Sequence, residues 1–349
     1  MTASSLQSRS TSWIDFDQFP RVPLCHQPTP IEPLLRLTDE LGGPRLFIKR
    51  DDCTGLATGG NKARKLEFLV GEAVKQGADV LVTQGAVQSN HVRQTAAAAC
   101  KHGMKCVALL ERRVPNRADE YEATGNVMLD RLFGAKLEFR PAGLDMNAEA
   151  ESVAKRLAAE GHRPYFIPGG GSNVIGALGY AACAQEIVRQ RRADGLAFQW
   201  IVTPTGSTGT HAGLVAGLHA LGVDLPVMGI SVRHKRDRQI AAVHALAQAT
   251  AEKLGCGPLP PERTLVDDGY VGDGYGIPAP STLDAIVQTA RTEGIVLDPV
   301  YTGKGMAGLI GLVRQGFFKP EDNVLFLHTG GSSALFAYED DFAGATRSQ

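Results

Sequence analysis

The chain has 349 residues, of which 43% are hydrophobic and 40 are glycine, so it can bury the core of one large or two ordinary globular domains. Its formal net charge is −1, with neither a basic stripe nor an acidic tail, which argues against nucleic acid and membrane surfaces as partners. No segment approaches the roughly 18 apolar residues of a membrane span. Chemistry on a small molecule is the class of function that remains.

The first residues, MTASSLQSRSTSW, are basic and rich in serine, and they lack the apolar stretch of a signal peptide. This composition predicts a solvated extension, with a short organelle-targeting peptide as the alternative. The six cysteines show no C-x-x-C spacing and no pairing pattern. They therefore indicate reduced thiols in a cytoplasmic protein and no metal site.

Short apolar runs alternate with helical periodicity along most of the chain. In residues 62–76, for example, apolar side chains recur at the spacing of one helix face. Strands that alternate with helices predict parallel sheets covered on both faces, which is an α/β fold class. Strands are predicted at 45–50, 79–85, 105–111, 135–141, 163–169, 199–206, 227–233 and 323–330.

The predicted strands fall into two groups along the chain. Four of them lie between Gly77 and Gly169, while the others precede Lys62 or follow residue 199. We therefore expect a small inserted α/β domain at 67–170 and a large domain made of 1–66 and 171–349, with a cleft between them.

Four predicted strand-to-helix turns are rich in glycine and hydroxyl side chains. In open α/β sheets, such turns lie at the carboxyl ends of the strands, where ligands bind. Together they predict a cofactor site. The turns are GGNK (59–62), QSNH (88–91), GSTGTHAG (206–213) and HTGGSSA (328–334).

The third turn has the features of a phosphate site, because its backbone N–H groups and the hydroxyls of Ser207, Thr208 and Thr210 precede a helix. A glycine-rich turn without a ligand is the alternative. The chain lacks a Walker A motif, because GLATGGNKA inserts Asn61 before the lysine, and it lacks a dinucleotide fingerprint. A compound with one phosphate group fits better than a nucleotide.

Lys62 follows two glycines and an asparagine at the start of a predicted helix. The positive end of a helix dipole disfavours an ammonium ion and so favours a neutral, nucleophilic amine. A reactive amine with a phosphate site elsewhere suggests pyridoxal 5′-phosphate, whose aldehyde reacts with a lysine. The alternative is that Lys62, Arg64 and Lys65 form a solvated basic face.

Six segments carry a resemblance to a known family: IKRDDCTGLATGGNKARKLEFL, TQGAVQSNHVRQTAA, IPGGGSNVIGALGY, TGSTGTHAG, LDPVYTGKGMAGLI and LHTGGSSALFAY. They resemble the pyridoxal-phosphate enzymes that include 1-aminocyclopropane-1-carboxylate deaminase, D-cysteine desulfhydrase and L-cysteate sulfo-lyase. The similarity covers residues 16 to 340. It implies the tryptophan-synthase-β-like fold (fold type II), with two open parallel-sheet domains, the cofactor between them, and a homodimer.

The resemblance also implies roles for the residues that contact the cofactor. Lys62 is expected to bond to the aldehyde carbon, and Asn90 to hydrogen-bond the 3-hydroxyl group. Thr302 and Thr329 are expected near the pyridine nitrogen. The phosphate is expected in the loop of Gly206, Ser207, Thr208, Gly209 and Thr210.

A further set of residues is expected at the substrate. Ser89, Asn90 and His91 match the positions that receive the substrate carboxylate, and they begin a helix, where an anion is favoured. Tyr301 matches a tyrosine beside the substrate. Lys62 is the expected base, while Ser89 or Tyr301 relays protons or assists the leaving group.

Thr302 departs from the pattern of the aminocyclopropane deaminases, which carry glutamate after this tyrosine. A neutral threonine leaves less negative charge beside the ring nitrogen, which favours departure of a β-substituent over cyclopropane opening. The reaction we expect is therefore α,β-elimination, which yields pyruvate and ammonia.

Two substrates remain open, L-cysteate with sulfite as the leaving group and D-cysteine with sulfide. The segments CTGLATGGNK, GLDMNAE and IPGGGSN resemble the sulfo-lyase more closely, so L-cysteate is preferred. Its sulfonate needs several polar partners. We expect them at Thr54, Thr58 and Ser172.

Two further points have alternative interpretations: the role of a charged run after one strand, and whether the protein is an enzyme. Arg233, His234 and Lys235 either attract a dianionic substrate or form a solvated charged run after a strand. In addition, the same fold can serve as a non-catalytic protein that binds an amino acid or a phosphate compound.

Overall fold

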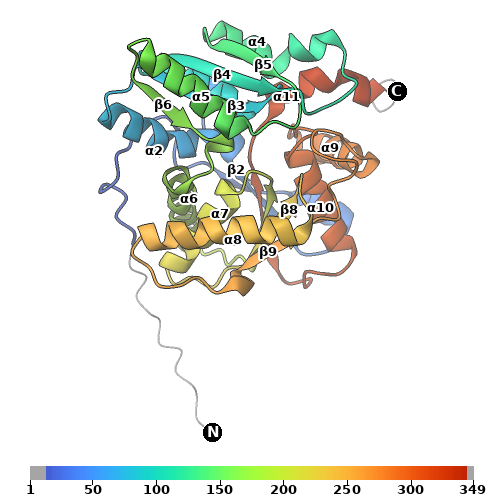
Figure 1. Cartoon of the computed structure of the whole chain (residues 1–349). Coiled ribbons are helices and arrows are strands. Elements are labelled where there is room, and N and C mark those ends of the chain that lie inside the picture. Colours follow the sequence, from blue (N-terminus) through green and yellow to red (C-terminus); the bar gives the residue numbers. More distant parts are fainter. Residues whose placement is uncertain (1–12, 344–349) are drawn as a thin grey trace.

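The computed structural model describes residues 13–343, so the predicted extension at residues 1–13 lies outside the described residues except for Trp13. Figure 1 shows two α/β units, one above the other, each built around its own sheet. The strands are β1 (Ile31–Pro33), β2 (Arg45–Arg50), β3 (Val80–Ala86), β4 (Lys105–Glu111), β5 (Lys136–Arg140), β6 (Pro164–Ile167), β7 (Trp200–Thr205), β8 (Val227–Ser231), β9 (Thr264–Asp267) and β10 (Asn323–His328).

The helices alternate with these strands along most of the chain. They are α1 (Leu35–Leu41), α2 (Lys62–Lys75), α3 (Asn90–Lys101), α4 (Gly125–Leu132), α5 (Met146–Ala159), α6 (Val174–Ala193), α7 (Gly209–Ala220), α8 (Arg236–Lys253), α9 (Pro280–Glu293), α10 (Thr302–Arg314) and α11 (Ser332–Leu335). The helix predicted at 62–76 is confirmed as α2.

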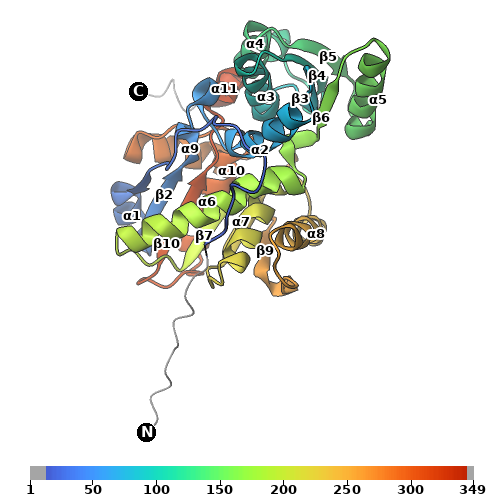
Figure 2. The ribbon, with the colours of Figure 1, turned by 90° about the vertical axis from the view of Figure 1, so that its left-hand side faces the viewer.

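The smaller sheet has the strand order β5-β4-β3-β6, and all of its pairs are parallel. Along β3 the buried side chains alternate between two cores. Leu81 packs with α2 and α3, whereas Val80 and Val82 pack with α5. Helices therefore cover both faces of this sheet, as Figure 2 shows. Successive side chains of a strand point to opposite faces, so a strand with apolar residues at consecutive positions must be covered on both sides.

The larger sheet has the order β1-β2-β10-β7-β8-β9, in which β1 alone runs antiparallel to its neighbour. Its central strand β10 alternates in the same way. Leu325 and Leu327 pack towards α6 and α7, and Val324 and Phe326 pack towards α9 and α10. This gives the predicted fold of two parallel-sheet units.

All eight predicted strands are present, and the sequence patterns missed β1 and β9. β1 has three residues and ends at a proline, and β9 has four residues. Segments this short at the edges of a sheet carry too little alternation to be recognised. The strands group into sheets as expected, while the domain boundaries at 66/67 and 170/171 stay predictions.

Candidate active site

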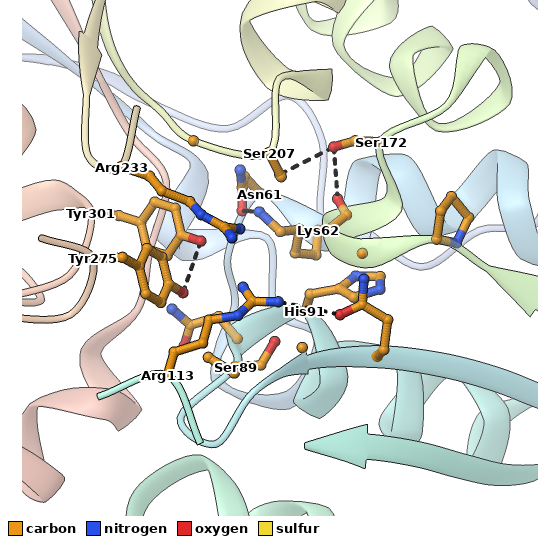
Figure 3. A pocket seen from close by; sticks show the side chains of 18 of the residues that line it. Asn61, Lys62, Ser89, His91, Arg113, Ser172, Ser207, Arg233, Tyr275 and Tyr301 are labelled. Atoms are coloured by element: carbon orange, nitrogen blue, oxygen red, sulfur yellow. Dashed lines mark hydrogen bonds between the residues drawn. The ribbon is translucent and has the colours of Figure 1, made fainter. Parts of the chain in front are cut away.

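A cavity of about 270 Å³ lies between the two sheets. The residues that line it follow the carboxyl ends of strands in both units, among them Ser89 after β3, Gly206 after β7 and Thr329 after β10. Helices α2, α3, α7 and α10 all begin at its walls. Because helix N-termini are positive, the cavity suits anionic groups. Figure 3 shows this site from close by.

Lys62 is held at the cavity by an unusual backbone turn. Gly59 and Gly60 have φ angles of 79° and 127°, which favour glycine. A Cβ atom at Gly60 would lie 2.3 Å from the amide nitrogen of Gln94. The N–H of Asn61 donates to the Thr329 carbonyl at 3.0 Å, which ties this turn to the end of β10. The glycines before the lysine therefore permit a close approach between chain segments.

The Lys62 side chain is buried, and its Nζ atom lies 3.2 Å from Asn61 Oδ1 and 5.7 Å from the centre of the Tyr301 ring. Burial lowers the pKa of its amine to about 8, an effect that Asp298 opposes and Arg93 reinforces. Lys65 is also buried, as is Arg64, which pairs with Asp51 and Glu186. The alternative of a solvated basic face is therefore wrong.

The loop after β7 supplies a cup for an anion. Gly206 and Ser207 line the cavity, and Thr208 and Thr210 line the recess that adjoins it. Thr208 has a φ of 75°, a strained conformation of the kind that clusters at ligand sites. Gly209 lies behind them and donates its N–H to the Ser172 hydroxyl at 3.1 Å.

The buried amine of Lys65 lies behind this cup. The Nζ atom of Lys65 donates to the Gly170 carbonyl at 3.1 Å and would lie 2.9 Å from a Cβ atom placed at Gly209. Burial holds the pKa of Lys65 well below its usual value, and Lys62 adds to that effect. A phosphate in the cup would offset this burial cost, because opposite charges favour each other's ionised forms. Lys65 was not assigned to the site from the sequence.

The N-terminus of α3 brings Ser89, Asn90 and His91 to the cavity, as expected. The Ser89 hydroxyl caps the helix by accepting from the Val92 N–H at 3.2 Å. His91 Nε2 lies 2.8 Å from the Thr83 hydroxyl, and burial holds the pKa of the imidazole well below its usual value. The Ser89 hydroxyl and the backbone N–H groups at this helix end are therefore the neutral donors that this wall offers to an anion.

The start of α10 places Tyr301 in the cavity with its hydroxyl 3.0 Å from that of Tyr275. Thr329 also lines the cavity. Thr302 does not: its hydroxyl is fully buried and donates to Asp298 Oδ1 at 2.7 Å. Of the two threonines predicted beside the ring nitrogen, the structure thus brings Thr329 to the site.

Thr54 and Thr58 do not line the cavity. The Thr54 hydroxyl is buried and bonds both the N–H and the carbonyl of Gly60 at 2.8 Å. The Thr58 hydroxyl lies 2.9 Å from that of Ser333. These side chains hold the turn before Lys62, whereas Ser172 does line the cavity.

Among the cationic and aromatic residues of the cavity, three were missed or left open by the sequence patterns. Arg113 follows β4 and was not singled out, and Tyr275 lies in an irregular segment. Arg233, which was left open, lines the cavity, while Lys235 is exposed and pairs with Asp268. The guanidinium carbons of Arg113 and Arg233 lie 5.7 and 5.9 Å from the centre of the Tyr275 ring.

Residues 13–343 contain neither a metal-binding cluster nor a membrane-spanning helix. No three His, Cys, Asp or Glu side chains cluster there in a way that would hold a metal ion. In the same part of the chain, no helix combines the length and apolar character needed to cross a membrane.

A buried amine with a lowered pKa and a phosphate cup in one cavity suit a cofactor that carries both an aldehyde and a phosphate group. They define the class of enzymes that bind pyridoxal phosphate on a lysine. Residues 22–330 match the pyridoxal-phosphate dependent enzymes, and the chain belongs to that family. The expectation of a pyridoxal-phosphate enzyme is confirmed, and the alternative of a non-catalytic binding protein is set aside.

The chain is similar to D-cysteine desulfhydrases and to a homologue of another pyridoxal-phosphate enzyme. The chain is 49% identical to D-cysteine desulfhydrase of Serratia proteamaculans and 50% identical to that of Klebsiella pneumoniae, over 92% of this chain and 96% and 97% of theirs. A solved structure of an aminocyclopropane-carboxylate (ACC) deaminase homologue matches with a TM-score of 0.85 and 39% identity, over 94% of this chain and 97% of that one. The D-cysteine alternative is therefore the activity named among these relatives, and they do not single out L-cysteate.

The residues present fit the cofactor. The loop at the start of α7, with Lys65 behind it, suits its phosphate. Lys62 suits its aldehyde, and the Asn90 amide lies in the same cavity. The individual roles of these side chains stay predictions.

Proposed function

We propose that this enzyme is a carbon–sulfur lyase that eliminates sulfite from L-cysteate. The observation that carries the proposal is the charge of the cavity wall. Lys62, Arg113 and Arg233 line it, whereas no aspartate or glutamate among the described residues does so. An amino acid with a sulfonate side chain carries two negative groups, and such a wall would stabilise both.

The two arginines are placed to share one anionic group. In Figure 3 their guanidinium groups reach towards each other from opposite sides of the pocket, next to Tyr275. Arg113 pairs with Glu111, whose other carboxylate oxygen accepts from the Gly143 N–H at 3.0 Å. Arg233 is exposed at the cavity and makes no ion pair within the described residues. Its guanidinium is therefore free to bind a sulfonate.

The remaining wall would hold the other end of the substrate. The N-terminus of α3, with Ser89, Asn90 and His91, would bind the α-carboxylate through N–H and side-chain donors. Burial raises the pKa of the Tyr301 phenol well above its usual value, so this hydroxyl stays protonated. With Tyr275 as its hydrogen-bond partner, Tyr301 would donate to the leaving group.

Bound pyridoxal phosphate supplies the electron sink for the negative charge that forms at the substrate Cα atom. Lys62 Nζ would accept the Cα proton. The carbon–sulfur bond would then break with its electron pair on sulfur, which releases sulfite. The resulting 2-aminoacrylate would take up water and give pyruvate and ammonium. With the Cα proton returned to the sulfite, L-cysteate and water balance against hydrogensulfite, pyruvate and ammonium.

D-Cysteine is the second candidate, and the relatives favour it, because those at 49–50% identity are D-cysteine desulfhydrases. Its side chain carries at most one weakly acidic thiol, so it would not require two arginines. The two candidates share Lys62 and the cofactor and differ at the arginine wall.

The test compares kcat/KM for L-cysteate, D-cysteine and aminocyclopropane carboxylate on one preparation loaded with cofactor. We expect L-cysteate to be the best substrate, with release of sulfite and pyruvate. A tenfold ratio corresponds to about 1.4 kcal/mol of differential transition-state stabilisation. A higher value for D-cysteine would overturn the choice and make the chain a D-cysteine desulfhydrase.

We also propose that the enzyme works as a homodimer in the cytoplasm. The family resemblance supports the dimer, and six unpaired cysteines suit a reducing compartment. Light scattering coupled to size exclusion would test the dimer, and a monomeric mass would reject it.

A further inference from the structure

Arg93 lies in the first turn of α3, directly behind the cavity, and its side chain is fully buried. It donates to three carbonyl oxygens: Asn90 Oδ1 at 2.8 Å, Asn126 Oδ1 at 2.6 Å and the backbone oxygen of Gly59 at 2.8 Å. No carboxylate within the described residues accepts a hydrogen bond from it. The hydrogen bonds that it makes therefore orient neutral groups rather than an ion-pair partner, and its buried Nε atom has no hydrogen-bond partner among the described residues.

The first of these bonds fixes the orientation of the Asn90 amide. The Oδ1 atom of Asn90 also accepts from Asn126 Nδ2 at 3.0 Å, so two donors converge on it. An amide oxygen held in this way leaves the amide nitrogen as the free half of the group. Because Asn90 lines the cavity, that nitrogen is the half available there as a donor.

The third bond holds the turn that carries Lys62. The Gly59 carbonyl also accepts from Gln94 Nε2 at 2.8 Å, and Gln94 Oε1 accepts from the Ala63 N–H at 2.6 Å. Arg93 and Gln94 thus form hydrogen bonds to the backbone before Lys62, at Gly59, and after it, at Ala63. A planar guanidinium with several donors in fixed directions can bond the two turns at once, which a lysine cannot do in the same geometry.

We propose that Arg93 is a positioning residue that couples the two cofactor-binding turns. It presents the Asn90 amide nitrogen as a donor to the 3-oxygen of the cofactor and fixes the Gly59 turn that places Lys62. This inference rests on the cofactor and is independent of whether the substrate is L-cysteate or D-cysteine.

The test measures the dissociation constant of pyridoxal phosphate and the absorption spectrum of the bound cofactor. Loss of a charge-assisted hydrogen bond predicts that Arg93→Met weakens cofactor binding by about tenfold or more and shifts the visible band. Arg93→Lys keeps the positive charge but loses the several donors of the planar guanidinium. We expect it to restore neither the cofactor affinity nor the position of the visible band. Arg112→Met is the matched control, because Arg112 is exposed and pairs with Glu122 on the surface.

A double-mutant cycle with Asn90→Ala separates positioning from general stability. If Arg93 acts through Asn90, Arg93→Met should weaken cofactor binding less in the Asn90→Ala background than in the unaltered protein. Equal losses in the two backgrounds, or full rescue by Arg93→Lys, would overturn the proposal. If the methionine variant does not fold, Arg93→Gln replaces it in the same cycle. A smaller loss of cofactor binding in the Asn90→Ala background would again support the proposal, and an equal loss would overturn it.

Discussion

Replacing Arg113 by methionine tests the anion-binding wall most directly. The Arg113 side chain is 17% exposed and its partner Glu111 is 7% exposed, so both charges lie largely out of water. A charge-assisted hydrogen bond in such a place contributes about 1.5–3 kcal/mol. At about 1.4 kcal/mol for each factor of ten, Arg113→Met should lower kcat/KM for L-cysteate by roughly 10- to 150-fold. For D-cysteine, which places no sulfonate there, we expect a change below about threefold.

The assay follows sulfite, sulfide and pyruvate release on the same enzyme batch. Part of the loss would come from Glu111, whose carboxylate would be left unpaired near an anionic substrate. Arg113→Met combined with Glu111→Gln should therefore recover some L-cysteate turnover. Arg112→Met is the control, because this neighbouring arginine does not line the cavity. An equal loss for both substrates would refute the reasoning and assign Arg113 a structural role.

Three further predictions concern the cofactor site. Borohydride reduction followed by peptide mapping should place the pyridoxyl group on Lys62, and a label on Lys65 would contradict the assignment. Burial lowers the Lys62 pKa to about 8, so the fraction of neutral amine grows as pH rises towards that value. The rate at which the protein without cofactor reacts with added pyridoxal phosphate should therefore level off above about pH 8. A rate that keeps rising to about pH 10 would indicate a lysine with an ordinary pKa. Thr302→Val removes a hydrogen-bond donor from buried Asp298 and should lower the free energy of unfolding by about 1–3 kcal/mol, which denaturant titration can measure. Cofactor titration should show a nearly unchanged affinity. A large loss of affinity would place Thr302 at the cofactor ring.

Local patterns predicted most of the fold. The eight longer strands and α2 were read from periodicity, because a side chain's face is set by the repeat of its own segment. β1 and β9 were missed, since three or four residues contain too little of that repeat. The glycine-rich turns likewise indicated segments that line the cavity.

The positions of individual hydroxyl groups were less predictable. Thr54 and Thr302 stand in glycine-rich or cofactor-facing motifs, yet both hydroxyls turn inward, to Gly60 and to Asp298. A motif shows which residue types lie near a site, but the direction of each side chain depends on which buried polar group needs a partner.

The sequence by itself determined the α/β class, and it indicated Lys62 and the glycine-rich loop at 206–210 as candidate cofactor residues, because each depends on residues that are neighbours along the chain. Only the tertiary structure decided the contents of the cavity wall. Arg113, Arg233 and Tyr275 come from three separate segments, and their proximity depends on how the two sheets pack together. The same holds for Lys65, whose place behind the loop at 206–210 follows from the close approach of α2 to the start of α7. Contacts of this kind are set by the packing of whole elements, and no local period or motif encodes them.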